Sequence, residues 1–167
     1  RRVLFRSLHL YTGAPGRLEQ IELGQNFMAF VDYAHTPDAV TNVLKSARKF
    51  TNGKLIAVLG CGGDRDKSKR PLMGQALMLA DYPIFTSDNP RSEDPNQILK
   101  EMTSGLNHNG EVISDRRAAI ARAVELAQPG DVVAVLGKGH ETGQEINGEK
   151  LPFDDRKVLA NAIAGRK

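Results

Sequence analysis

Four short polar segments carry the side chains that could bind a charged small molecule. Each segment follows directly after a short apolar run; the four are residues 32–38, 60–66, 87–91 and 137–143. Arg65 and Arg91 can each form a forked pair of hydrogen bonds with a carboxylate. Asp88, Asn89 and Glu141 can accept hydrogen bonds from an ammonium group. A site that holds both kinds of group fits a zwitterion, especially one with more than one charged end.

The pattern around these segments predicts strands and helices in alternation. Continuous apolar runs at 55–59 and 132–136 are typical of strands buried on both faces of a sheet. From 37 to about 50 the apolar residues follow helical spacing, and Thr36 is a suitable N-cap. Further strands are predicted at 18–23, 27–31, 83–86, 111–113 and 144–146, and further helices at 71–80, 96–106, 116–127 and 155–164. We therefore predict an α/β fold, a Rossmann-like, mostly parallel sheet with helices on both faces.

This fold gives the four polar segments a common place. Ligands of open parallel sheets bind outside the carboxyl ends of the strands, where all four segments are expected to lie. Taken singly, each segment has a plainer interpretation: a helix cap at Asp32 and Thr36, a flexible turn at 60–63, or a β-turn at 88–91. The glycines of 60–63 and 137–139 fit neither the dinucleotide-binding fingerprint nor a Walker A loop, so both of those sites are excluded.

Metal and nucleophile sites are not expected. The four histidines share no helix face and have no cysteine partner; they are His9, His35, His108 and His140. No Ser/His/Asp or Cys/His set is apparent, and we interpret Cys61 as a small turn residue rather than a nucleophile.

Composition narrows the class of protein. A chain of 167 residues with 40% hydrophobic and 26% charged residues suits one globular domain. A net charge of +3, 5% aromatic residues and the lack of Trp argue against a nucleic-acid partner. One cysteine fits a reducing compartment, and no apolar run is long enough to span a membrane. We therefore expect a cytoplasmic domain with no nucleic-acid partner and no membrane partner.

Seven motifs in a fixed order resemble the C-terminal domain of the Mur ligase family. They lie at 15–19, 31–38, 60–67, 69–73, 88–91, 137–141 and 153–156. The resemblance covers the chain from about Leu10 onward, and it is closest to the branch of the family that adds meso-diaminopimelate. Residues 1–9 are interpreted as an uncertain or foreign segment, because the first seven lack a Met and show no clear pattern.

The resemblance implies ATP-dependent amide bond formation in peptidoglycan synthesis. ATP would phosphorylate the terminal carboxylate of UDP-N-acetylmuramoyl-L-alanyl-D-glutamate, and an amino group of meso-diaminopimelate would attack the acyl phosphate. ATP and Mg²⁺ would be bound mainly by a central domain, and the UDP-sugar by an N-terminal domain. Neither domain is in this sequence, so we expect residues 10–167 to be the C-terminal domain and to be inactive by itself as a ligase.

The resemblance also assigns roles to individual residues. The family's recognition motif for meso-diaminopimelate is matched by Asp88, Asn89, Pro90 and Arg91. Residues that hold the same amino acid are matched by Arg65, Gly137 and Glu141. Lysine-adding relatives carry a different residue at the position of Arg91, and lysine has no distal carboxylate with which Arg91 could pair. Four residues are expected to approach the nucleotide, namely Arg17, Asp32, Tyr33 and His35.

Two other functions stay open. A detached Mur-like module could bind an amino acid or a nucleotide without catalysis, and the lack of a P-loop in this sequence motivates that alternative. Another amide ligase of the superfamily, such as the folate–glutamate type, is a third possibility. The motifs at 88–91 and 137–141 together argue against it.

Overall fold

Strands and helices alternate along residues 14–166, the part of the chain that the computed structural model describes. The strands are β1 (Glu19–Gln20), β2 (Met28–Asp32), β3 (Leu55–Cys61), β4 (Tyr82–Ser87), β5 (Glu111–Val112), β6 (Val132–Leu136), β7 (Gly143–Ile146) and β8 (Glu149–Pro152). The helices are α2 (Pro37–Arg48), the short 3-10 helix η1 (Lys67–Lys69), α3 (Arg70–Leu77), α4 (Pro95–Met102), α5 (Arg116–Leu126) and α6 (Asp155–Gly165). The segment 1–9 singled out in the sequence lies outside the described residues.

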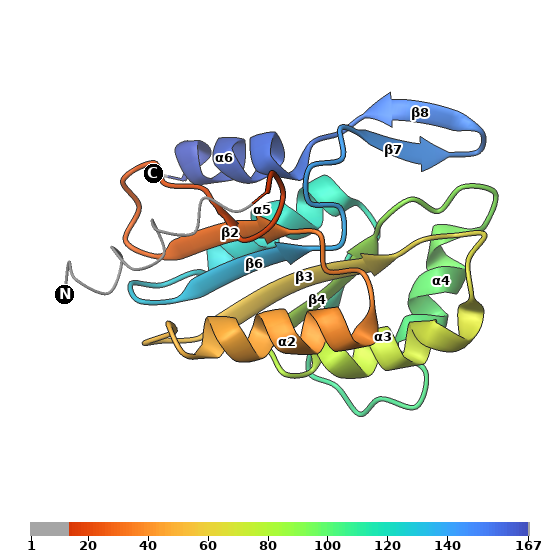
Figure 1. Cartoon of the computed structure of the whole chain (residues 1–167), viewed down its shortest axis with the longest axis horizontal. Helices are drawn as coiled ribbons and strands as arrows, with labels where there is room; N and C mark the ends of the chain where they lie inside the picture. The colour runs from red at the N-terminus through yellow and green to blue at the C-terminus, as the bar shows by residue number, and fades with distance from the viewer. Residues whose placement is uncertain (1–13, 167) are drawn as a thin grey trace.

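The first six strands form one sheet, in the order β1-β2-β6-β3-β4-β5. The β1 strand is antiparallel to β2, and the other four pairings are parallel. Helices α2, α3 and α4 lie against one face of this sheet, and α5 and α6 lie against the other (Figure 1). The predicted Rossmann-like arrangement, a mostly parallel sheet with helices on both faces, is therefore confirmed.

The central strands β3 and β6 are buried along their whole length. Their alternate side chains enter two separate hydrophobic layers, as the two-residue period of a strand requires. In β3, for example, Leu55 and Leu59 belong to the layer under α2 and α3, whereas Val58 belongs to the layer under α5 and α6. The continuous apolar runs of the sequence reflect this burial on both faces.

Polar side chains cap the start of α2, α4, α5 and α6. Thr36 accepts a hydrogen bond from the backbone N–H of Ala39, and Asp115 and Asp154 cap α5 and α6 in the same way. The predicted helix 96–106 ends earlier, at Met102, because the chain turns there and Gly105 adopts the left-handed conformation with φ +73°. Among the described residues, no helix is long and apolar enough to cross a membrane.

The β7–β8 hairpin stands apart from the main sheet. Only its first strand was predicted, because 149–152 is exposed and carries no apolar alternation. Its turn has a local signature nonetheless: Asn147 and Gly148 have φ values of +50° and +79°, as a two-residue type I′ turn requires. In the N-terminal part of the described residues, the predicted strand 18–23 shortens to Glu19–Gln20, and it begins at Glu19 because Leu18 is left-handed, with φ +43°.

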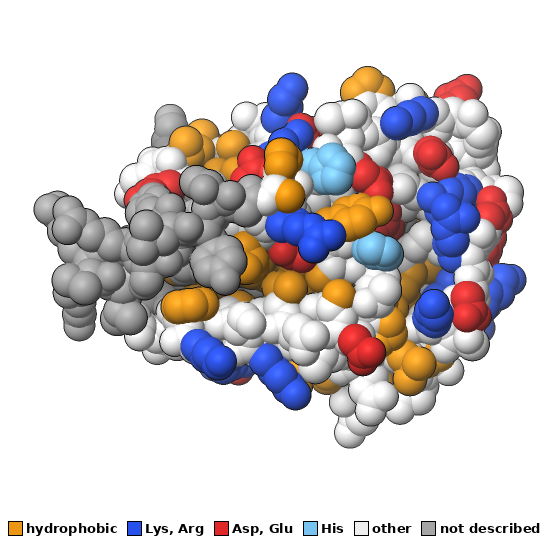
Figure 2. Space-filling model, in the orientation of Figure 1, with side chains coloured by type: hydrophobic (Ala, Val, Ile, Leu, Met, Phe, Trp, Pro, Cys, Tyr) orange, Lys and Arg blue, Asp and Glu red, His pale blue; other side chains and the backbone are white. Residues whose placement is uncertain are grey.

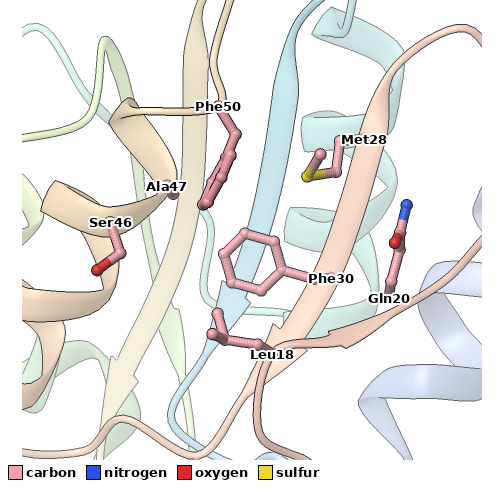
Figure 3. Close-up of a pocket in the computed structure, with 7 residues that line it drawn as sticks. All are labelled: Leu18, Gln20, Met28, Phe30, Ser46, Ala47 and Phe50. Carbon is pink, nitrogen blue, oxygen red and sulfur yellow. The ribbon is translucent and has the colours of Figure 1, made fainter. Parts of the chain in front are cut away.

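A small apolar recess lies between the β1–β2 edge and α2. Phe30 and Phe50 point into it from opposite sides, and Leu18 and Met28 lie beside them (Figure 3). Its volume of about 30 Å³ is far below the roughly 300–1,000 Å³ of ligand pockets. We therefore regard it as a packing defect of the core.

Candidate functional site

The carboxyl ends of the parallel strands meet at one edge of the sheet, where a cleft of about 440 Å³ opens. Figure 2 shows acidic, basic and histidine side chains together over these strand ends. Of the residues predicted to hold the amino acid, the structure brings six into this main cleft: Arg65, Asp88, Asn89, Arg91, Gly137 and Glu141. The seventh, Pro90, does not line it. The four polar segments together therefore predicted where this cleft lies, although no single segment was sufficient to predict it.

Residues 88–91, here called the recognition loop after the family motif that they resemble, pack against the glycine-rich segment that follows β3. The backbone N–H of Gly63 donates to the carbonyl of Asn89 at 2.8 Å. A side chain at Gly63 would overlap the carbonyl oxygen of Pro90, which itself accepts from the N–H of Glu93 at 3.0 Å. Glycine at this position is thus required for close approach, and Pro90 shapes the loop rather than facing the cleft.

A buried ammonium group organises the floor of the cleft. Lys138 is fully buried, and its Nζ donates to Asn89 Oδ1 and to Glu141 Oε2, both at 2.9 Å. Asp88 Oδ1 lies 3.7 Å from the same Nζ. Sequence reasoning missed Lys138, since nothing in the pattern distinguishes a buried lysine from an exposed one after a strand.

Burial and Lys138 act in opposite directions on the two carboxyl groups of this floor. Burial raises the pKa of Asp88, although Arg116 and Lys138 favour its ionised form. Burial also opposes ionisation of Glu141, but hydrogen bonds from Lys138 and Asn89 outweigh it, so the pKa of Glu141 is lowered. Glu141 therefore remains an anion that can accept a hydrogen bond from a ligand's ammonium group.

Below the cleft, a second missed residue holds the strand ends in place. Arg116 is fully buried and donates from Nε and Nη2 to the carboxylate of Asp155, at 2.8 and 2.6 Å. It also donates to the carbonyls of Ser87 at 3.1 Å and Leu136 at 2.9 Å. These carbonyls immediately precede Asp88 and Gly137 in the chain. Arg116 thus ties α5 and α6 to the two strands that deliver site residues.

On the other side of the cleft, Arg70 joins α3 to the segment after the recognition loop. Its guanidinium donates to Glu93 at 2.8 and 2.9 Å, to Glu101 at 2.7 Å and to the carbonyl of Gly62 at 3.2 Å. These bonds from Arg70, with one from the backbone N–H of Asp64, lower the pKa of Glu93 from 4.5 to about 2. The ion pairs therefore brace the recognition loop from behind.

This lowered pKa predicts a loss of stability in acid. A carboxylate whose folded-state pKa is depressed stabilises the fold above its unfolded pKa, and this contribution declines as pH falls from 4.5 towards 2. We expect Glu93→Gln to be less stable than the parent chain near pH 6 and to lose less further stability between pH 4.5 and 3. Urea unfolding at each pH measures this, and equal pH dependence in both proteins would contradict it.

Cys61 ends β3 and lines the cleft, so it belongs to a strand and not to a turn as predicted. It is 8% exposed. Burial, and secondarily Asp88, raises the pKa of its thiol to about 12. We expect Ellman's reagent at pH 8 to modify Cys61 slowly in the folded chain and rapidly in urea, because only the thiolate reacts. Equally fast modification in both states would show that the thiol is accessible and ionised.

A second hollow, of about 460 Å³, is lined by the four residues that were predicted to approach a nucleotide: Arg17, Asp32, Tyr33 and His35. Tyr33 and His35 line both hollows, and their ring centroids are 4.5 Å apart. The carboxylate of Asp32 accepts hydrogen bonds from the backbone N–H groups of Leu18 at 2.8 Å and Ala34 at 2.7 Å. Asp32 therefore shapes the wall, whereas the exposed Arg17 is open to a ligand.

Charged groups in the main cleft define the ligand that it fits. Arg65 is exposed at the cleft, with one long hydrogen bond of 3.4 Å to a neighbouring carbonyl, and Arg91 is 22% exposed. The Oδ1 atom of Asn89 already accepts from Lys138 Nζ and from the N–H of Glu145. Glu141 is therefore the acceptor that, with the two arginines, suits a molecule with carboxylate and ammonium groups. Among residues 14–166, no group of three or more His, Cys, Asp and Glu side chains is arranged to hold a metal ion.

Known proteins resemble this chain over most of its length. Residues 16–139 match the family model described as Mur ligase, glutamate ligase domain. A UDP-N-acetylmuramoyl-L-alanyl-D-glutamate–2,6-diaminopimelate ligase of Streptomyces coelicolor is 58% identical over 159 residues, which are 90% of this chain and 31% of that protein. The enzyme of the same name from Geobacillus thermodenitrificans is 52% identical over 157 residues, which are 92% of this chain and 32% of that protein. The chain thus spans about a third of the length of these relatives.

Solved structures agree with this match. A structure of a ligase with that name superposes with a TM-score of 0.86 at 48% identity, covering 94% of this chain and 33% of its own. The UDP-N-acetylmuramate–alanine ligase of Thermotoga maritima superposes with a TM-score of 0.58 at 17% identity. The superposition covers 96% of this chain and 32% of that structure's chain. The second comparison establishes a shared fold alone.

Proposed function

The chain belongs to the Mur ligase family, and on that premise we propose that residues 10–167 are the C-terminal, amino-acid-binding domain of a ligase. The ligase adds meso-diaminopimelate to UDP-N-acetylmuramoyl-L-alanyl-D-glutamate during peptidoglycan synthesis in the cytoplasm. ATP phosphorylates the substrate's terminal carboxylate, the amine attacks the acyl phosphate, and phosphate leaves as the amide bond forms. The observation that carries the proposal is that six of the residues predicted to hold the amino acid, five with side chains and one glycine, line the same cleft of about 440 Å³.

Charge complementarity supports meso-diaminopimelate as the amino acid. This molecule has two carboxylates and two amino groups, and the cleft offers partners of both signs. Arg91 and Arg65 suit carboxylates, whereas Glu141 suits the ammonium group that does not react. The reacting amine must lose its proton to become a nucleophile, and nearby protein carboxylates would favour its protonated form. We therefore place it near the mouth of the cleft, away from Glu141 and Asp88.

The second hollow supports an approach of ATP from the neighbouring side. Arg17 can pair with a phosphate, and the shared Tyr33–His35 wall brings the two hollows next to each other. Such an arrangement would set the acyl phosphate beside the amino acid, and positioning of this kind is a large part of catalysis. The P-loop, the Mg²⁺ ligands and the UDP-sugar site would come from the other two domains of the ligase.

A chimaera tests this proposal. It joins the first two thirds of the Geobacillus thermodenitrificans ligase to this chain, with the truncated Geobacillus portion as the control. We expect ATP-dependent ligation of meso-diaminopimelate by the chimaera and none by the truncated portion. A folded chimaera that forms no amide product, or that ligates lysine in preference, would overturn the proposal. A folded chimaera that binds the amino acid without ligation would support the non-catalytic module instead.

A further inference from the structure

The β7–β8 hairpin lies alongside the recognition loop. The backbone N–H of Arg91 donates to the carbonyl of Glu145 at 2.9 Å, and the N–H of Asn147 donates to the carbonyl of Arg91 at 2.8 Å. Arg91 and Ile146 form a parallel bridge between these bonds. The first strand of the hairpin therefore acts as a short partner strand for the residue expected to recognise the distal carboxylate.

Side chains strengthen this attachment at the two residues that begin the recognition loop, Asp88 and Asn89. The backbone N–H of Glu145 donates to Asn89 Oδ1 at 3.0 Å, and Gln144 Nε2 donates to the carbonyl of Asp88 at 2.7 Å. Arg91 itself is held in the left-handed conformation, with φ +52°, which a non-glycine residue keeps only where its surroundings enforce it. The hairpin supplies much of that enforcement.

The guanidinium group of Arg91 is oriented by two acceptors. Its Nε donates to Glu145 Oε2 at 2.9 Å, and its Nη1 donates to the carbonyl of Gly63 at 2.8 Å. Of the five N–H donors of a guanidinium, these bonds use two, and the other three form no bond with residues 14–166. The N–H groups that remain, on Nη1 and Nη2, can donate to the two oxygens of a carboxylate.

We propose that Glu145 is a positioning residue, which presents Arg91 to the distal carboxylate of the bound amino acid without touching the ligand. The inference rests on the function proposed above and extends it to the hairpin. An arginine side chain loses rotamer entropy when it binds, and orientation by Glu145 removes part of that cost before the ligand arrives. Glu145 thereby contributes to the choice of a dicarboxylic diamino acid over lysine.

Three variants of the chimaera test the role of Glu145. Glu145→Ala is expected to raise KM for meso-diaminopimelate about 3- to 10-fold, the cost of one newly mobile side chain, with kcat within 2-fold. Glu145→Gln should restore most of the affinity, because the amide oxygen still accepts from Nε of Arg91. The matched control is Glu149→Ala, an exposed glutamate on the other strand of the same hairpin, for which we expect no change.

A double variant separates positioning from a general effect on folding. In an Arg91→Ala background, adding Glu145→Ala should change KM less than 2-fold, because Glu145 acts through Arg91. An undiminished effect in that background, or an unchanged KM in Glu145→Ala alone, would overturn the inference while leaving the proposed function intact. If instead the parent chimaera fails to use meso-diaminopimelate, the proposed function fails and the role of Glu145 fails with it.

Discussion

Replacing Arg91 with alanine is expected to lower kcat/KM for meso-diaminopimelate by roughly 30- to 4,000-fold in the chimaera. This range corresponds to about 2–5 kcal/mol, the typical cost of removing one partner from a desolvated, hydrogen-bonded charge pair. The Arg91 side chain is 22% exposed, so the pair with a carboxylate would be partly screened by solvent, and we expect a loss in the lower half of the range. Steady-state kinetics at saturating ATP measures the loss.

Two controls make the result specific to the distal carboxylate. Arg91→Lys keeps the positive charge but loses the forked geometry, so its kcat/KM should lie between those of the parent and Arg91→Ala. Any slow ligation of lysine should be unaffected by Arg91→Ala, because lysine has no distal carboxylate. Equal losses with both amino acids would mean that Arg91 supports the loop and not the ligand.

Replacing Arg116 with methionine is expected to lower the free energy of unfolding of the chain by about 3–5 kcal/mol, the usual cost of leaving a buried charge without its partner. Arg116 and Asp155 are both fully buried, and Arg116 also satisfies the carbonyls of Ser87 and Leu136. The substitution removes the two hydrogen bonds that the Asp155 carboxylate accepts from Arg116 and the one that each carbonyl accepts from it. Urea unfolding monitored by circular dichroism measures the change.

A double variant distinguishes the ion pair from simple packing. Arg116→Met combined with Asp155→Leu should cost less than the sum of the two single substitutions, because neither buried charge is then left alone. The control is Arg122→Met, a partly exposed arginine on the same helix that pairs with Glu111 and Glu125, for which little change is expected. Additive losses at 116 and 155 would contradict the paired role.

Local chemistry made much of the fold predictable from the sequence. The apolar runs at 55–59 and 132–136 indicated the central strands because burial on both faces requires apolar residues at every position. Thr36, Asp115 and Asp154 indicated helix starts because a side-chain oxygen there satisfies a free N–H group. The position of the main cleft followed from the strand ends, since parallel strands place their carboxyl ends together.

The supporting residues could not be predicted, because their roles depend on contacts between distant segments. Lys138 and Arg116 are charged residues of a kind that usually lies at the surface, and only the partners around them make burial tolerable. Glu145 is 54 residues from Arg91 in the chain, and no sequence spacing relates the two. The hairpin was missed for a different reason, because the Asn147–Gly148 pair is a local turn signal that was present in the sequence and was not used.

The most direct test of the central claim is a competition between amino acids in a second chimaera. It joins the first two thirds of a lysine-adding Mur ligase to this chain, and meso-diaminopimelate and lysine are supplied together at equal concentration. Mass spectrometry of the product identifies which one was added. If this chain selects the amino acid, the product contains meso-diaminopimelate; a chimaera that is active and still adds lysine would contradict the account.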